Sequence, residues 1–195
     1  KSRVYLVDVP GAKQSVISIG CPGPVRTDPD YFPAVVMNYK LGGSFNGNVN
    51  LVLREEKGYT YGARTGFNGG LFAGNFNAGA SVRSSATAES VTIFRDLMEK
   101  YSKEVSQADL DFTKNAMLKG YTRQFETLGA KLGMLGEISL YNLPTDYVKL
   151  EQETIRTMTL DRLRSLAGNY INPSKMYYVV AGDAKTQAEE LVKIG

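Results

Sequence analysis

The chain has 195 residues, of which 43% are hydrophobic and 22% charged, and its net charge at pH 7 is +3. These values are typical of a globular domain that buries a core without disulfide bonds. Its basic residues are spread along the chain, which argues against nucleic-acid binding, and no apolar run is long enough to cross a bilayer.

Histidine is absent from the sequence, and Cys21 is its one cysteine. Because zinc sites and most acid–base catalysis near neutral pH use histidine, a self-contained Ser-His-Asp, Cys-His or His-ligated metal site is excluded. Cys21 lies in a β-branched run and is interpreted as a core residue rather than a reactive thiol. The chain begins at Lys1 without an initiator Met, so we expect a fragment of a longer protein.

The predicted elements begin with two β-branched strands, residues 3–9 and 14–21, which a short turn joins in an antiparallel sense. Asp28 as the cap and Pro29 at the first helical position then predict a helix. This helix runs to about Leu41, where two glycines follow and favour its end.

A helix–turn–strand segment comes next. A helix over residues 51–57 ends at Gly58, and a strand over residues 59–67 follows at once. Residues 68–70 (NGG) predict a hairpin turn, and residues 71–82 form the return strand. Period-two alternation groups one set of side chains on the first strand: Tyr59, Tyr61, Ala63, Thr65 and Phe67.

The second half of the chain is rich in helices. The predicted elements are a helix over 84–103, a helix that a capping box at Ser106 begins, a less regular, glycine-dotted helix over about 127–141, a short helix over 146–153, a helix capped by Thr159, a buried strand over 175–181 and a terminal helix. The glycine-dotted helix is expected to pack closely on its neighbours. Because strands and helices are segregated, the pattern predicts one α+β domain over residues 1–195, a largely antiparallel sheet with helices on one face.

Two features invite a functional interpretation. The glycine-rich residues 42–47 follow a helix rather than a strand and lack nucleotide-binding spacing, so nucleotide binding is rejected. Arg54 and Tyr61 flank the turn at Gly58 and can present a cation and a phenol on one side of a surface. By residue type alone, a structural role explains both, with the arginine pairing to Glu55 and the tyrosine packing in the sheet.

Three segments carry a resemblance to a known family: residues 42–45 (GGSF), residues 53–61 (LREEKGYTY) and residues 79–82 (GASV). Together they resemble the C-terminal, non-zinc domain of the pitrilysin/insulinase zinc metallopeptidases, and most closely the bacterial two-domain members. The later elements follow the family order. Residues 46–50 (NGNVN) depart from the Ser-Arg-Leu run that members often carry there.

The resemblance implies a LuxS/mitochondrial-processing-peptidase-like metallohydrolase fold, in which two α+β domains close around a cleft. One domain holds zinc in an H-x-x-E-H motif, and the other lends an Arg and a Tyr seven positions apart, as Arg54 and Tyr61 are. It thus implies a substrate-binding half of a zinc metalloendopeptidase, inactive alone, with no cofactor here and Zn²⁺ on a partner domain or subunit. Arg54 and Tyr61 would donate hydrogen bonds to the carbonyl of a peptide or unfolded polypeptide as its oxygen gains charge.

A second hypothesis is a catalytically inactive structural or peptide-binding relative that acts as an assembly partner. An H-x-x-E-H motif upstream of Lys1, or in an adjacent gene, would favour the enzyme. The residues identify neither the substrate nor the compartment, for which the bacterial relatives suggest the periplasm or cell envelope.

Overall fold

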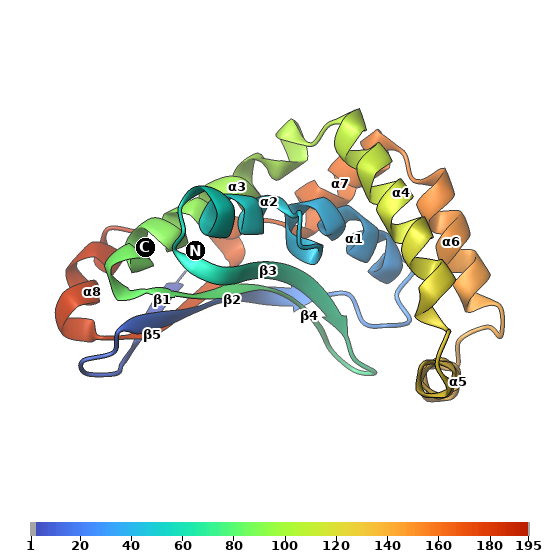
Figure 1. Cartoon of the computed structure of the whole chain (residues 1–195), viewed down its shortest axis with the longest axis horizontal. Helices are drawn as coiled ribbons and strands as arrows, with labels where there is room; N and C mark the ends of the chain where they lie inside the picture. Colours follow the sequence, from blue (N-terminus) through green and yellow to red (C-terminus); the bar gives the residue numbers. More distant parts are fainter. Residues whose placement is uncertain (1–2, 195) are drawn as a thin grey trace.

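The computed structural model describes residues 3–194, the side chain of Thr122 excepted. One five-stranded sheet carries most of the helices on one face (Figure 1). Its strands are β1 (Arg3–Asp8), β2 (Gln14–Gly23), β3 (Thr60–Gly69), β4 (Gly74–Arg83) and β5 (Tyr177–Gly182). The strand order is β1-β5-β2-β4-β3, with only β1 and β5 parallel, which confirms the predicted α+β class and the largely antiparallel sheet.

The helices fall where the sequence predicts them, with small shifts at their ends. They are α1 (Tyr31–Asn38), α2 (Asn48–Asn50), α3 (Thr87–Glu104), α4 (Gln107–Gln124), α5 (Leu128–Tyr141), α6 (Tyr147–Thr157), α7 (Leu160–Tyr170) and α8 (Ala184–Val192). Two π-helical turns, η1 (Tyr39–Gly43) and η2 (Leu51–Glu56), extend α1 and α2, and 3₁₀ turns form η3 (Ser84–Ala86) and η4 (Pro173–Lys175). Among residues 3–194, no helix has the length and apolar character needed to cross a membrane.

The core lies between the sheet and the helices. On β4 the predicted period-two set is buried from Phe76 onward, whereas Phe72, which the alternation placed in the same set, precedes β4 and is 95% exposed. On α3 the apolar side chains at helical spacing are buried against this set. The residues are Phe76, Ala78, Ala80 and Val82 on β4, and Val91, Phe94, Met98 and Tyr101 on α3. Cys21 on β2 is half-buried and packs against this core, as expected.

The pairing of the first two strands differs from the simple hairpin that a short turn indicates. β1 and β2 run in opposite directions, but β5 lies between them and pairs with both. The Val9 N–H donates to the Gly182 carbonyl at 2.8 Å, so the turn after β1 passes over the end of β5.

The start of α1 was predicted two residues too early. Asp30, not Asp28, occupies the N-cap position. The Asp28 carboxylate instead accepts the Asp30 N–H at 2.8 Å, which forms a turn before the helix. The Asp30 carboxylate makes no cap bond, because it accepts hydrogen bonds from Arg162 and Tyr170 on α7.

The hairpin turn lies farther along the chain than predicted. Asn68 and Gly69 remain in β3 and pair with β4, and the Gly70 N–H donates to the Ala73 carbonyl at 2.9 Å to close the turn. Gly69 is needed for close approach, since a Cβ there would lie 2.7 Å from the Arg26 nitrogen. This glycine therefore marks packing against the segment after β2, not the turn itself.

Helix α5 contradicts its prediction. It is a regular α-helix, and none of its residues is buried, although it is the most apolar helical sequence in the second half of the chain. Figure 1 shows it at one end of the molecule, apart from the sheet. Glu137 ties it to Arg26 by an ion pair at 3.0 Å, so a polar contact rather than close packing holds it.

Candidate functional site

The turn between η2 and β3 positions the candidate residues. The helix ends, as predicted, at Gly58, which has a φ of 62° that glycine adopts without strain. The Gly58 N–H donates to the Arg54 carbonyl at 3.1 Å, and the Tyr59 N–H to the Leu53 carbonyl at 2.9 Å. These bonds form a glycine C-cap. Since Leu53 is fully buried, the turn is anchored to the core.

Arg54 lies on the last helical turn with its side chain 34% exposed. Its Nη1 is 3.2 Å from Glu55 Oε1, the ion pair that the structural interpretation expects. Even so, this buried nitrogen has no hydrogen-bond acceptor among the described residues. The guanidinium therefore keeps donor capacity that the protein does not use.

Phe45 in the glycine-rich loop contacts the guanidinium of Arg54. The Arg54 guanidinium lies 4.6 Å from the centre of the Phe45 ring, and that of Arg64 lies 5.7 Å from the same ring. Such contacts fix the direction of a guanidinium and favour its charge. Asn50 in turn holds Phe45, because its Nδ2 donates to the Phe45 carbonyl at 2.8 Å.

Tyr61 lies on a β-bulge and not on the buried face. Thr60 pairs with Val82 and Ala63 with Ala80, so β3 has one residue more than β4 between these pairs. The extra residue turns the Tyr61 side chain outward, where it is 93% exposed. Period-two alternation grouped Tyr61 with the buried residues of β3, and this grouping is wrong because a bulge breaks the period.

Two polar side chains, those of Thr60 and Asn50, hold the bulge. The Thr60 hydroxyl donates to the Ser81 carbonyl at 2.6 Å and accepts the Gly62 N–H at 3.1 Å. The N–H of Ala63 donates to Asn50 Oδ1 at 3.0 Å. Asn50 therefore bonds to both the Phe45 loop and the bulge.

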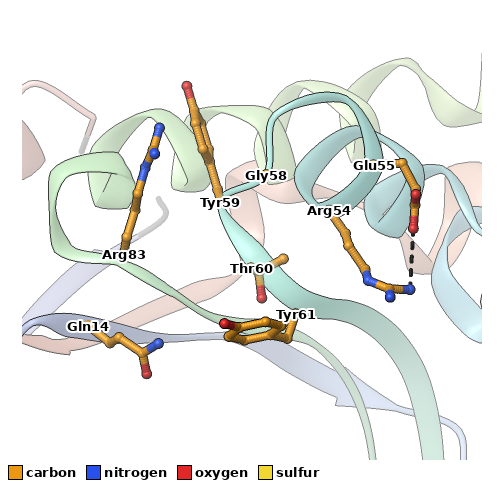
Figure 2. A pocket seen from close by; sticks show the side chains of 8 residues that line it. All are labelled: Gln14, Arg54, Glu55, Gly58, Tyr59, Thr60, Tyr61 and Arg83. Carbon is orange, nitrogen blue, oxygen red and sulfur yellow. Dashed lines mark ion pairs between the residues drawn. The ribbon is translucent and has the colours of Figure 1, made fainter.

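Arg54 and Tyr61 line one cavity of about 440 Å³. Its other lining residues are Gln14, Glu55, Gly58, Tyr59, Thr60 and Arg83. Figure 2 shows the side chains of Arg54, Tyr61 and Gln14 directed to one side of the ribbon, while Tyr59 and Arg83 point to the opposite side. The structure thus brings the cation and the phenol to one surface, with the amide of Gln14 beside them.

An ionic cluster closes the opposite side of the turn. Glu89 accepts hydrogen bonds from the Tyr59 hydroxyl at 2.6 Å and the Lys57 ammonium at 2.9 Å. Both bonds favour the carboxylate and lower the pKa of Glu89, while the bond to Glu89 raises the pKa of Tyr59. The Arg83 guanidinium lies 4.7 Å from the centre of the Tyr59 ring. These contacts tie the start of β3 to α3.

Sequence reasoning located Arg54 and Tyr61 but missed three neighbours, Phe45, Asn50 and Gln14. None of the three carried a local signal: Asn50 precedes the predicted helix over residues 51–57, and the contacts of Phe45, Asn50 and Gln14 arise from separate elements.

A zinc site does not fit the residues of this chain. The sequence has no histidine, and residues 3–194 hold no group of three or more His, Cys, Asp or Glu that could bind a metal. Among the residues that line the cavity, Glu55 supplies the one carboxylate that could bind a metal, and it already contacts Arg54.

Comparison with known proteins gave a consistent set of similarities. A family model described as "Peptidase M16 inactive domain" matches residues 1–117. A peptidase M16 inactive domain from Pseudomonas fluorescens is similar in structure with a TM-score of 0.84 and 26% identity, over 93% of this chain and 43% of that one. A protease from Helicobacter pylori has a TM-score of 0.82 and 18% identity, over 92% of this chain and 44% of that one.

A third similar structure is the inactive peptidase domain of a predicted zinc protease from Bordetella parapertussis. Its TM-score is 0.72 at 15% identity, over 89% of this chain and 96% of that one. The chain therefore spans less than half of the first two structures and nearly all of the third. Among curated proteins, none matches the sequence.

Proposed function

The chain belongs to the inactive domains of the M16 (pitrilysin/insulinase) zinc peptidases, and from this we propose that it is the substrate-binding half of a zinc metalloendopeptidase. In this proposal Arg54 and Tyr61 face the zinc site of a partner domain or subunit across a cleft. The membership agrees with the family resemblance of the sequence. The roles of the two residues and of the partner are our inference.

The observation that carries the proposal is the pair of unused donors at one cavity. A tyrosine that is 93% exposed contributes little to the core, so its burial does not explain its place. Arg54 Nη1 lies 3.2 Å from the Glu55 carboxylate but makes no hydrogen bond within the described residues, so the guanidinium can still donate to a further acceptor. Both features are explained if a ligand with an oxygen acceptor occupies the cavity.

The chemistry of the two donors suits a peptide carbonyl. A guanidinium stays charged at any working pH and a phenol O–H donates one hydrogen bond, so both can stabilise a carbonyl oxygen as it gains negative charge. The glycine cap and the bulge fix the backbone of each donor. Such a fixed donor contributes about 100- to 1000-fold in turnover. The zinc belongs to the partner, and no step at the metal is assigned to this chain.

The test uses the complete peptidase, which is this chain together with its zinc-bearing domain or subunit. Arg54→Ala and Tyr61→Phe should each lower kcat for a quenched-fluorescence peptide by about 100- to 1000-fold. Matched controls are Arg95→Ala on α3 and Tyr141→Phe on α5, which lie outside the cavity and should leave kcat within twofold. Full activity of both site variants would remove the proposed roles.

The alternative, an inactive structural or peptide-binding relative, gives a different result in the same experiment. A stable complex with a partner that lacks H-x-x-E-H and cleaves no peptide would support it. In that case there is no turnover to measure, and the Arg54→Ala and Tyr61→Phe variants should weaken peptide binding by the complex.

A further inference from the structure

Most of the helices cover one face of the sheet and leave the other face open (Figure 1). A second hollow lies on this open face, because exposed positions of β2, β4 and β5 line it. Its volume is about 360 Å³. The outward-facing residues that line it come from β2, β4 and β5, and they are Ser18, Gly20, Asn75, Asn77, Tyr177 and Val179.

One wall of the hollow is apolar. Tyr177 and Val179 on β5 are 53% and 37% exposed, and they stand opposite the small residues Gly20 and Ser18 of β2. Tyr5 stacks on Tyr177 with its ring centre 6.4 Å away. Because the neighbours on β2 are small, these larger side chains border a trough. Apolar side chains that are exposed next to one another, rather than scattered singly, are a feature of binding surfaces.

The other wall consists of asparagine side chains that hydrogen-bond to one another. Asn75 Oδ1 accepts hydrogen bonds from Asn68 Nδ2 at 3.3 Å and Asn77 Nδ2 at 3.4 Å. No hydrogen bond within residues 3–194 uses the Asn75 N–H₂ group or the Asn77 Oδ1. A donor and an acceptor thus stay free beside an apolar wall. A polypeptide backbone offers the complementary acceptor and donor, and its side chains can meet the apolar wall.

The hollow and the Arg54–Tyr61 cavity share one strip of the sheet. The outward positions of β2 are Gln14, Val16, Ser18 and Gly20. Gln14 lines the Arg54–Tyr61 cavity, and Ser18 and Gly20 line the hollow. Gln14 and Gly20 are six residues apart along β2, a distance of about 20 Å, which an extended peptide covers with about six residues of its own.

We propose that this hollow is a distal subsite that binds an apolar side chain of an extended polypeptide. The bound side chain would lie about six residues along that polypeptide from the peptide group that contacts Arg54 and Tyr61. The link to cleavage rests on the proposed function, whereas the binding itself does not. A free amide donor and acceptor beside an apolar wall, in line with the Arg54–Tyr61 cavity, favour an extended polypeptide over a second copy of the chain.

A tryptophan reporter tests the binding. The sequence has no Trp, so Tyr177→Trp supplies a single fluorophore in the hollow, at a position exposed enough to accept it. The probe is a 16-residue peptide of Ser, Thr and Gln with one Phe, and its Phe-free version is the reference. We expect a saturable blue shift with the Phe peptide only. If the reporter variant fails to fold, methyl NMR of Val16 and Val179 in the native chain replaces it.

The apolar wall is tested by Val179→Ser, which should weaken the Phe peptide about three- to tenfold. Val192→Ser on α8 is the matched control, because Val192 is exposed outside the hollow. In the complete peptidase, Val179→Ser should raise KM for long substrates with an apolar residue about six positions from the cleaved bond and leave kcat unchanged.

Three results would overturn the proposal: no shift with either peptide, equal shifts with both, or a shift that depends on chain concentration alone. The last result would assign the face to a second copy. Arg54 and Tyr61 do not line the hollow, so the two proposals fail separately. If the reporter shows no shift but Arg54→Ala and Tyr61→Phe still lower kcat, only the subsite in the hollow is refuted. If the reporter shifts but those variants leave kcat unchanged, only the proposed function is refuted.

Discussion

Replacing Asn50 by Ala should cost the chain roughly 2–6 kcal/mol of unfolding free energy, because one amide holds two backbone segments. Asn50 is fully buried and bonds to the Phe45 carbonyl at 2.8 Å and the Ala63 N–H at 3.0 Å. Alanine leaves both backbone groups without that partner, and an unsatisfied buried group costs about 1–3 kcal/mol. The sum is a large share of the 5–15 kcal/mol that stabilises a typical domain.

The same substitution should loosen the site. Without Asn50, the loop beneath the Arg54 guanidinium loses its bond at Phe45, and the bulge that directs Tyr61 outward loses its bond at Ala63. A displacement of about 1 Å can lower turnover about 100-fold. In the complete peptidase we therefore expect kcat to fall by about 10- to 100-fold at temperatures where the variant is still folded.

Urea unfolding of the 195-residue chain, followed by far-UV circular dichroism, measures the free energy. Asn46→Ala is the matched control, because Asn46 lies in the same loop with an exposed side chain and should change the free energy by less than about 0.5 kcal/mol. If Asn50→Ala unfolds at the same urea concentration as Asn46→Ala, the two hydrogen bonds do not support the loop and the bulge as argued.

Two further predictions concern the turn. Gly58→Ala should lower the unfolding free energy by about 1–2 kcal/mol in the same urea assay, because φ is 62° and an alanine backbone is strained there. No atom lies within 4 Å of the added Cβ, so the cost comes from the backbone and not from a clash. Gly58→Asn should recover part of this free energy, and an unchanged urea midpoint for Gly58→Ala would contradict the argument. Hydrogen bonds from Tyr59 and Lys57 lower the pKa of Glu89, so its contribution is complete above the ordinary carboxyl pKa and is lost as pH falls through the lowered value. The unfolding free energy of the native chain should therefore fall more steeply with acidification than that of Glu89→Gln, and equal slopes would refute the linkage.

The fold class followed from local patterns, whereas the strand order did not. The buried set of β4 has a strict period of two, and the capping box at Ser106 forms both of its hydrogen bonds as predicted. The insertion of β5 between β1 and β2 depends on pairs such as Val16 with Ala181, far apart in the chain. Alternation states which face is buried but not which strand lies alongside.

Helix α5 shows that apolar composition alone does not predict burial. Its apolar sequence predicted close packing, but Leu128 is 85% exposed. An apolar composition predicts burial only when its residues form a stripe that another element can cover. In this helix the glycines and leucines are distributed around the axis, and nothing in the sequence indicates which partner surface it faces.

Arg54 and Gly58 could be placed from the sequence because a glycine stop is a local signal. The exposure of Tyr61 could not, because it depends on a bulge that Asn50 and Thr60 stabilise from separate segments. A bulge is invisible to alternation until its partners are known.

The segment 46–50 gains a physical meaning from these contacts. Its last residue, Asn50, connects the Phe45 loop to the bulge by hydrogen bonds. The Phe45 ring then supports the Arg54 guanidinium, while the bulge directs Tyr61 to the same cavity. One buried amide therefore couples the orientations of both donors, so a change in this loop should alter Arg54 and Tyr61 together rather than one at a time. Double-mutant cycles that combine Asn50→Ala with Tyr61→Phe should accordingly be non-additive in kcat.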